Sequence, residues 1–176
     1  MNVKTKATFD SSFWVHAVYL DLGDFLLHDY QLLCTPAVEN ELGRDNPTGR
    51  RLKALLDNGS IQREEAGKEQ MRLYGEGERA AINLAMEKGL LLLIDDWKPY
   101  QVALEYGIEV VNSLVYLVRL YRQDHISVER ILDALAKMTR RGTIKPEWIY
   151  AALEMVALIR ETRRVKGGKN DKSKEA

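Results

Sequence analysis

The stretch Glu78–Asp96, ERAAINLAMEKGLLLLIDD, decides the fold class of this chain. Its first half places Ile82 and Ala85 on one side of a predicted helix, and Gly89 ends that helix. Leu90–Ile94 is then a short run of apolar residues only, and two aspartates terminate it. A strand that is apolar on both faces and directly follows a helix is typical of a parallel sheet with helices on both sides.

The sequence before this stretch alternates strands and helices in the same way. Val3–Phe9 has the two-residue period of a strand, and a helix follows for which Ser11 or Ser12 is a suitable cap. A second strand, Gln31–Cys34, ends before a Thr-Pro pair. A hydroxyl cap followed by proline in the first turn favours a new helix, which we expect to end near Gly43.

Two more helical stretches and a weak strand separate that helix from Glu78. Thr48 is expected to cap a basic helix that ends near Gly59. Ser60–Arg63 is a weak strand, and a polar helical stretch is predicted to run from there to Tyr74.

The C-terminal side continues the alternation and then becomes helical. Trp97–Tyr106 predicts a helix and Ile108–Val111 a last short strand. Three helical segments follow from Ser113, the last of them from Pro146 to about Arg164. We therefore predict an α/β protein: an open parallel sheet of about five strands flanked by helices in three layers, with a C-terminal helical extension.

Length and composition predict one domain in a reducing compartment. The chain has 176 residues, 45% of them hydrophobic, which suits one core, and we expect a domain of residues 1–165 and a basic, disordered tail of residues 166–176. A net charge of +0 excludes a general basic field for nucleic acid. The single cysteine, Cys34, excludes an intramolecular disulfide and a zinc site built on several thiolates. We expect a cytoplasmic protein with no signal peptide and no membrane span.

Acidic residues fall where the predicted strands end. Asp10 follows the first strand and Asp95-Asp96 the fourth, Glu41 lies on the helix after the second strand, and Glu78 begins the helix before the fourth. In open parallel sheets ligands bind at the carboxyl ends of the strands, so these acids could converge. Carboxylates that share a site repel unless a cation is present, and hard oxygen ligands favour Mg²⁺ or Mn²⁺.

Four segments of the sequence carry a resemblance to a known family: Phe9–Ser12, Thr35–Leu42, Gly77–Ala85, and Leu91–Asp96 with Gly107–Leu117 behind it. In these segments the sequence resembles the PIN-domain family, in particular its prokaryotic nucleic-acid-binding members related to VapC-type toxin ribonucleases. By this resemblance Asp10, Glu41, Glu78 and either Asp95 or Asp96 would be the metal-binding and catalytic acids, with Asp95 favoured over Asp96. The hydroxyl of Ser11 or Ser12 would support the site.

The resemblance implies a Mg²⁺- or Mn²⁺-dependent endoribonuclease that hydrolyses RNA phosphodiester bonds. One form of this family is the toxin of a toxin–antitoxin pair, which would give the chain an antitoxin partner. PIN relatives commonly dimerise, and apolar helices from Leu114 to Tyr121 and from Trp148 to Ile159 also favour a homodimer. Basic residues near the rim are candidates for phosphate contacts, although a solvated helix face explains them equally well: Arg44, Arg50, Arg51, Lys53 and Lys98.

Other interpretations remain open for the acids and for the chain as a whole. Asp10 could only cap a helix, Glu78 could only favour a helix dipole, and Asp95-Asp96 could be a turn. A catalytically silent PIN-like module that binds RNA or protein is one alternative function. The other is an aspartyl-phosphate phosphatase of the haloacid-dehalogenase type, which needs a second acid two residues after the first, where this chain has Ser12.

Overall fold

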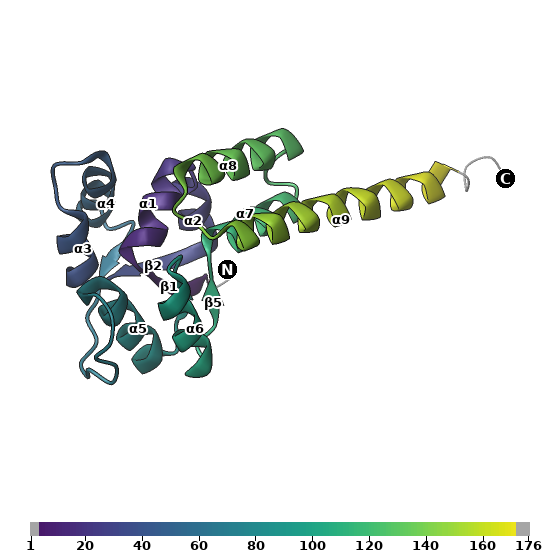
Figure 1. Cartoon of the computed structure of the whole chain (residues 1–176). Coiled ribbons are helices and arrows are strands. Elements are labelled where there is room, and N and C mark those ends of the chain that lie inside the picture. The colour runs from purple at the N-terminus through teal and green to yellow at the C-terminus, as the bar shows by residue number, and fades with distance from the viewer. Residues whose placement is uncertain (1–3, 172–176) are drawn as a thin grey trace. The chain divides into compact units, whose positions relative to one another are not determined.

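The sheet and the C-terminal helices form separate compact parts of the chain. The computed structural model describes residues 4–171, and the chain divides into two units, Met1–Ser113 and Leu114–Ala176. The first unit contains the strands and the candidate site. The second consists of helices (Figure 1).

Within residues 4–171 the sheet has five strands, all parallel, in the order β3-β2-β1-β4-β5. The predicted fold class is confirmed. Phe9 at the end of β1 pairs with Leu93 at the end of β4, so these two strands finish side by side. The strands are β1 (Thr5–Phe9), β2 (Tyr30–Cys34), β3 (Gln62–Arg63), β4 (Leu91–Leu93) and β5 (Val110–Val111).

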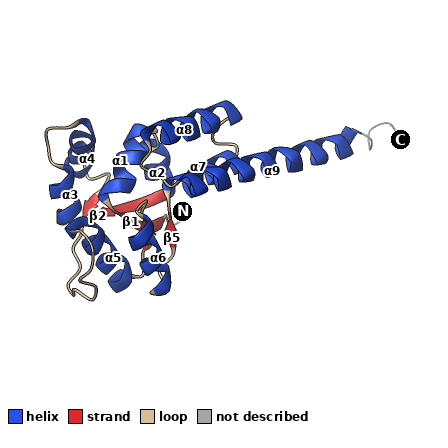
Figure 2. Cartoon of the chain, viewed as in Figure 1, coloured by secondary structure: helices blue, strands red, loops and turns tan. Residues whose placement is uncertain are grey.

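Helices connect successive strands and cover both faces of the sheet, as parallel pairing requires. Figure 2 shows α1 and α2 on one side of the strands and α5 and α6 on the other. The helices of this unit are α1 (Ser11–Tyr19), α2 (Gly23–Asp29), α3 (Pro36–Leu42), α4 (Pro47–Asp57), α5 (Glu76–Lys88) and α6 (Trp97–Glu105).

The helix starts follow capping chemistry, but two of the predicted caps are wrong. The Thr35 hydroxyl accepts from the backbone N–H of Val38 at 3.3 Å, as predicted for α3. For α1 the cap is Asp10 rather than a serine, because Asp10 is the last extended residue and its carboxylate reaches the third N–H of the helix. For α4 the cap is Asn46 rather than Thr48, since Pro47 already occupies the first helical position.

The prediction of a helix running to Tyr74 is also wrong. The segment between Arg63 and α5 is a loop, and a buried asparagine of α5 determines its course. Asn83 Oδ1 accepts from the N–H groups of Gln70 (2.9 Å) and Met71 (2.8 Å), while its Nδ2 donates to the Met71 carbonyl at 2.9 Å. These three bonds give the loop backbone partners that a helix would otherwise have supplied.

A continuous core lies between α5, α6 and the strands. Apolar side chains of the stretch Glu78–Asp96 dominate this core, and Ile82, Leu84 and Leu92 are fully buried in it. Aromatic packing supports the first strand end: the rings of Phe9 and Trp14 stack at 5.2 Å. The Trp14 indole N–H donates to the Thr48 carbonyl at 3.1 Å, which ties α1 to α4. The end of β1 is therefore rigidly supported.

The second unit contains the three predicted C-terminal helices, α7 (Ser113–Arg122), α8 (Val128–Arg141) and α9 (Pro146–Asp171). Arg163 of α9 ties this unit together: it contacts Asp124 at 2.7 Å and donates to the Tyr121 carbonyl at the end of α7, also at 2.7 Å. A cation is favourable at a helix C-terminus.

The end of α9 differs from the sequence prediction. The helix continues to Asp171, beyond the predicted end near Arg164. The predicted disordered tail includes residues 172–176, which lie outside the described part of the chain, and the prediction of one domain over residues 1–165 stays a prediction. None of the helices in residues 4–171 combines the length and apolarity that crossing a membrane requires.

Candidate metal centre

Three acids meet at the carboxyl edge of the sheet. Asp10 follows β1 directly, Asp96 follows β4 after two further residues, and Glu78 lies in the first turn of α5. One carboxylate oxygen from each of these three residues lies within 4.8 Å of the other two. Because β1 and β4 are parallel neighbours, their ends bring Asp10 and Asp96 together, and α5 brings Glu78 from the helix that leads into β4.

Asp10 is fully buried and has two roles in this arrangement. Its Oδ1 accepts from the Phe13 backbone N–H at 2.8 Å, which caps α1, and its Oδ2 accepts from the Ser12 hydroxyl at 2.5 Å. Burial raises the pKa of Asp10 well above its ordinary value, and the charges of Asp95 and Asp96 add to this, although the two hydrogen bonds oppose it. Capping and membership of an acidic cluster are therefore compatible here.

Glu78 is the second member of the cluster and is partly buried. Burial raises its pKa, as do the charges of Asp96 and Glu41. A Cβ atom on Gly75 would lie 2.3 Å from Glu78 Oε2, so the carboxylate fits closely over the start of α5. Glycine at that position makes room for it.

Glu41 lies beside the cluster and is held by two donors. The Gly77 backbone N–H donates to Oε1 at 2.6 Å, and the Ser11 hydroxyl donates to Oε2. A Cβ atom on Gly77 would lie 2.1 Å from Oε2, so the Glu41 carboxylate reaches the start of α5 in this position only because residue 77 has no side chain.

Glu39, two residues before Glu41, belongs to a different ion pair. Both of its oxygens accept from the Arg63 guanidinium, at 2.8 and 3.0 Å, and this hydrogen bonding lowers the pKa of Glu39. The short helix α3 thus directs one glutamate towards the acidic cluster and the other towards β3.

The two aspartates after β4 have separate environments. Asp95 is buried, with Oδ2 at 2.6 Å from His16 Nδ1 and Oδ1 accepting from the Ser113 N–H at 2.7 Å. Asp96 is exposed and supplies an oxygen to the cluster. The sequence alone favours Asp95 as the ligand, whereas the geometry brings Asp96 to Asp10 and Glu78.

His16 is a residue of this region that sequence reasoning missed. Its spacing from other histidines has no metal-ligand pattern, and the residue is buried on α1, only 4% exposed. One signal in the sequence could have indicated His16. It is a histidine among apolar positions of a helix, and that helix begins directly after a candidate ligand. A buried histidine needs a polar partner, and here the partner is Asp95.

Four of the five predicted basic residues have partners away from the cluster. Arg50 donates to the Asp45 carbonyl at 2.8 Å, Arg51 pairs with Asp24 at 3.1 Å and Lys53 pairs with Asp57. The charge of Arg44 acts on Glu39 and Asp57. Lys98, in the first turn of α6 and two residues after Asp96, has no such partner among the described residues.

The donor set fits a hard divalent cation. Asp10, Glu78 and Asp96 offer carboxylate oxygens only, and Mg²⁺ and Mn²⁺ prefer such ligands. The raised pKa values of Asp10 and Glu78 show that the protein surroundings disfavour their charged forms. A bound cation would favour those charged forms.

The fold and the cluster together define a class: an open parallel α/β protein with acids gathered at the strand ends. Comparison with known proteins identifies the family within that class. The family model DUF3368, described as a PIN domain, matches residues 20–157, and the chain belongs to this family of PIN domains, which are generally nucleases. The matched residues include Glu41, Glu78, Asp95 and Asp96, whereas Asp10 precedes them and joins the cluster by geometry.

A search of solved structures finds one that is similar to this chain, whereas no curated protein matches the chain. The solved structure is a PilT N-terminus domain protein from the hyperthermophilic archaeon Sulfolobus solfataricus P2, with 16% sequence identity and a TM-score of 0.43. The similarity covers 74% of this chain and 94% of that one.

Proposed function

We propose that this protein is a Mg²⁺- or Mn²⁺-dependent endoribonuclease that hydrolyses phosphodiester bonds of RNA. The observation that carries the proposal is the approach of Asp10, Glu78 and Asp96 to within 4.8 Å at the edge of the sheet where parallel α/β proteins bind ligands. Membership of the PIN family supports nuclease chemistry at that place.

Asp10, Glu78 and Asp96 would hold the cation in this proposal, with Glu41 beside them. Bound there, the cation would supply a Lewis acid that activates water and offsets charge on the phosphate. Glu41 has both oxygens hydrogen-bonded, so its orientation is fixed before substrate arrives. Lys98, exposed and two residues after Asp96 in the chain, would bind a phosphate of the RNA.

Asp95 takes a positioning role in the same proposal. Its carboxylate bonds both His16 on α1 and the backbone N–H of Ser113 after β5. These two contacts hold the backbone in place at Asp95 and therefore position the next residue, Asp96. Ser11 and Ser12 act in the same way, since each hydroxyl donates to one acid of the site, Glu41 or Asp10.

The proposal also covers the protein's compartment, oligomeric state and partner. We place the activity in the cytoplasm, in a homodimer that an antitoxin protein inhibits. Exposed apolar side chains on the C-terminal helices, Val115, Met155 and Leu158, support self-association. Light scattering that finds only monomer well above micromolar concentration would contradict the dimer.

A cleavage assay with matched variants tests the proposed chemistry. Labelled RNA is incubated with the protein, with increasing Mn²⁺ and then with excess chelator. Asp10→Asn and Glu78→Gln are expected to lower the rate by about a hundredfold or more, since several kcal/mol of transition-state stabilisation depend on the cation. Glu39→Gln is the control, because Glu39 lies on the same helix as Glu41 but pairs with Arg63.

The same assay separates the alternative functions. Cleavage that resists the chelator, or that survives both Asp10→Asn and Glu78→Gln, would contradict the proposal. A silent module would bind RNA and leave it intact. A phosphatase would hydrolyse a generic phosphoester, but the position two residues after Asp10 is Ser12, whose hydroxyl supports Asp10 and cannot replace a second acid.

A further inference from the structure

The two units of the chain carry opposite net charges, which the total of +0 conceals. Met1–Ser113, the unit with the sheet and the acidic cluster, has 12 lysines and arginines against 18 aspartates and glutamates. Leu114–Ala176, the helical unit, has 14 against 8. The net charge is therefore −6 for the sheet unit and +6 for the helical unit. A polyanion is repelled by the first unit and attracted by the second.

The basic charge is concentrated in the second half of α9. Pro146–Ile159 contains two glutamates and no lysine or arginine, whereas residues 160–171 contain five lysines and arginines against two acids. Cations in the last turn of a helix can simply favour its dipole. Arg160 and Arg164, however, lie about three and two turns before Asp171, which is too far from the helix end for that effect.

The arginines of this segment fall into two kinds. Arg163 is a structural arginine, partly buried, and its guanidinium pairs with Asp124 at 2.7 Å. Arg160 and Arg164 are exposed, and their side chains have no hydrogen bond or ion pair with another described residue. The charge of Arg160 acts on Glu129, which is exposed as well. Residues four apart are neighbours on a helix, so Arg160 and Arg164 share one solvent-exposed face.

The chemistry of this face fits phosphates better than a lipid surface. A guanidinium group offers paired donors that match the oxygens of a phosphate. A helix that lies on a membrane needs a broad apolar face beside its cations. Val165 is the only large apolar residue between positions 160 and 171 of the sequence, so this half of α9 lacks such a face.

We propose that Arg160 and Arg164 of α9 bind phosphates of RNA outside the metal centre, so that the helical unit supplies affinity for RNA that the acidic sheet unit lacks. The inference rests on the proposed function for the identity of the polyanion, and it adds a holding surface to that function. A phosphate bound at this surface is not the one that is cut, so the contact stabilises bound substrate and transition state equally. Its loss should therefore raise KM and leave kcat unchanged.

Binding without metal tests this surface separately from cleavage. Fluorescence anisotropy of labelled single-stranded RNA is measured with full-length wild type in excess chelator, over a series of KCl concentrations. The double variant Arg160→Gln/Arg164→Gln is expected to weaken binding by about tenfold and to lower the slope of log Kd against log salt by about 1.4, the loss of two phosphate contacts. Arg160→Lys/Arg164→Lys keeps both charges and should stay within about threefold of wild type.

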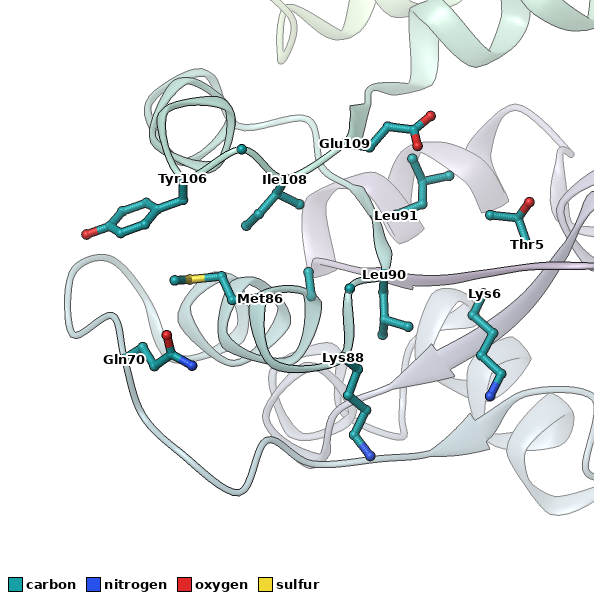
Figure 3. Close-up of a pocket in the computed structure, with 13 residues that line it drawn as sticks. Thr5, Lys6, Gln70, Met86, Lys88, Leu90, Leu91, Tyr106, Ile108 and Glu109 are labelled. Carbon is teal, nitrogen blue, oxygen red and sulfur yellow. The ribbon is translucent and has the colours of Figure 1, made fainter.

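A matched control and a second surface show whether the effect is specific. Lys6→Gln/Lys88→Gln also removes two positive charges, from the hollow at the amino edge of the sheet (Figure 3), and should change neither affinity nor salt slope. Sedimentation with vesicles of phosphatidylcholine and phosphatidylglycerol tests the lipid alternative. Vesicle binding that needs Arg160 and Arg164, together with RNA binding that does not, would overturn the inference in favour of a membrane surface.

The outcomes distinguish this inference from the proposed function. RNA that is held through the two arginines but stays uncut by wild type with Mn²⁺ would contradict the nuclease and support the holding surface. Cleavage with the same KM in wild type and Arg160→Gln/Arg164→Gln, or an unchanged salt slope, would overturn the surface and leave the nuclease. If that double variant fails to fold, the single variants decide: each should lower the salt slope by about 0.7, and no change in either overturns the inference.

Discussion

Charged side chains lie at both edges of the sheet, but their surroundings differ. At the carboxyl edge Asp10 is fully buried in a cluster with Glu78 and Asp96, and burial raises the pKa values of Asp10 and Glu78. At the amino edge a hollow of about 500 Å³ is lined by exposed residues that include Lys6 and Lys88 (Figure 3). Lys88 is paired there with Glu64 at 2.7 Å, and this hydrogen bond raises the pKa of Lys88.

This difference sets a solvated ion pair at the amino edge against a cluster of like charges at the carboxyl edge. An exposed pair such as Lys88–Glu64 is satisfied by its partner and by water, and contributes little to stability. Buried acids that repel one another are unfavourable until a cation arrives. The carboxyl edge therefore resembles a functional site, in which local stability is lower than the chain could achieve.

The largest expected effect concerns Mn²⁺ and Asp10. At a hundredfold excess over the dissociation constant, Mn²⁺ should stabilise the wild type by roughly 2 to 3 kcal/mol in thermal melts. Asp10→Asn should keep the α1 cap, because asparagine also accepts from the Phe13 N–H, and should melt at or above wild type without metal. Its response to Mn²⁺ should nearly vanish. If Mn²⁺ raised the melting temperature of wild type and Asp10→Asn equally, a metal site that includes Asp10 at the carboxyl edge would be contradicted.

The next effect concerns the loop that joins the two edges. Gln70 of this loop lines the amino-edge hollow and Gly75 lies against Glu78, while Asn83 clamps Gln70 and Met71. Asn83→Ala removes the partner of the buried N–H and carbonyl of Met71 and of the partly buried N–H of Gln70, and should destabilise the fold by about 2 kcal/mol. Urea unfolding measures this, with Asn58→Ala in an exposed turn as the control. Equal losses in both variants would show that the clamp is unimportant.

A smaller effect is expected from the close contact between Gly77 and the Glu41 carboxylate. Gly77→Ala should displace the Glu41 carboxylate, because the new Cβ would lie 2.1 Å from Oε2. We expect Mn²⁺ affinity to fall by about tenfold, the range for groups that orient metal ligands, while stability without metal changes little. Gly23→Ala is the matched control, since its Cβ would meet only Arg51, at 4.0 Å. Unchanged Mn²⁺ titrations for Gly77→Ala would place Glu41 outside the site.

The smallest effect is predicted for the amino edge. Lys88→Met and Glu64→Gln, alone and together, should show almost no coupling in denaturant unfolding, because the pair is largely solvated. Cleavage of RNA should be unchanged in all three variants. A strong loss of cleavage would show that this edge takes part in the chemistry.

Sequence reasoning located the acids but not the way each is used. The order of strands and acids predicted that Asp10, Glu41, Glu78 and the aspartate pair lie near one edge, because parallel strands end on the same side. The division between Asp95 and Asp96 was not predictable, since it depends on His16 and on the Ser113 N–H, 79 and 18 residues away from Asp95. Ser11 and Ser12 donate to Glu41 and Asp10; the family resemblance implies such a role for one of these hydroxyls, whereas capping chemistry alone favours them as helix caps.

The sequence by itself determined the α/β class, the parallel sheet and the approximate places of the helices between its strands, because apolar runs, Thr-Pro starts and glycine stops act over a few residues. It also determined that the chain has enough acids for a hard cation. Tertiary structure decided what depends on packing between distant segments. The loop after Arg63 is irregular because Asn83 supplies its partners, Gly77 leaves room for the Glu41 carboxylate that α3 brings to α5, and Asp96 joins Asp10 because β1 and β4 finish side by side. Long-range contacts of this kind leave no local pattern in the sequence.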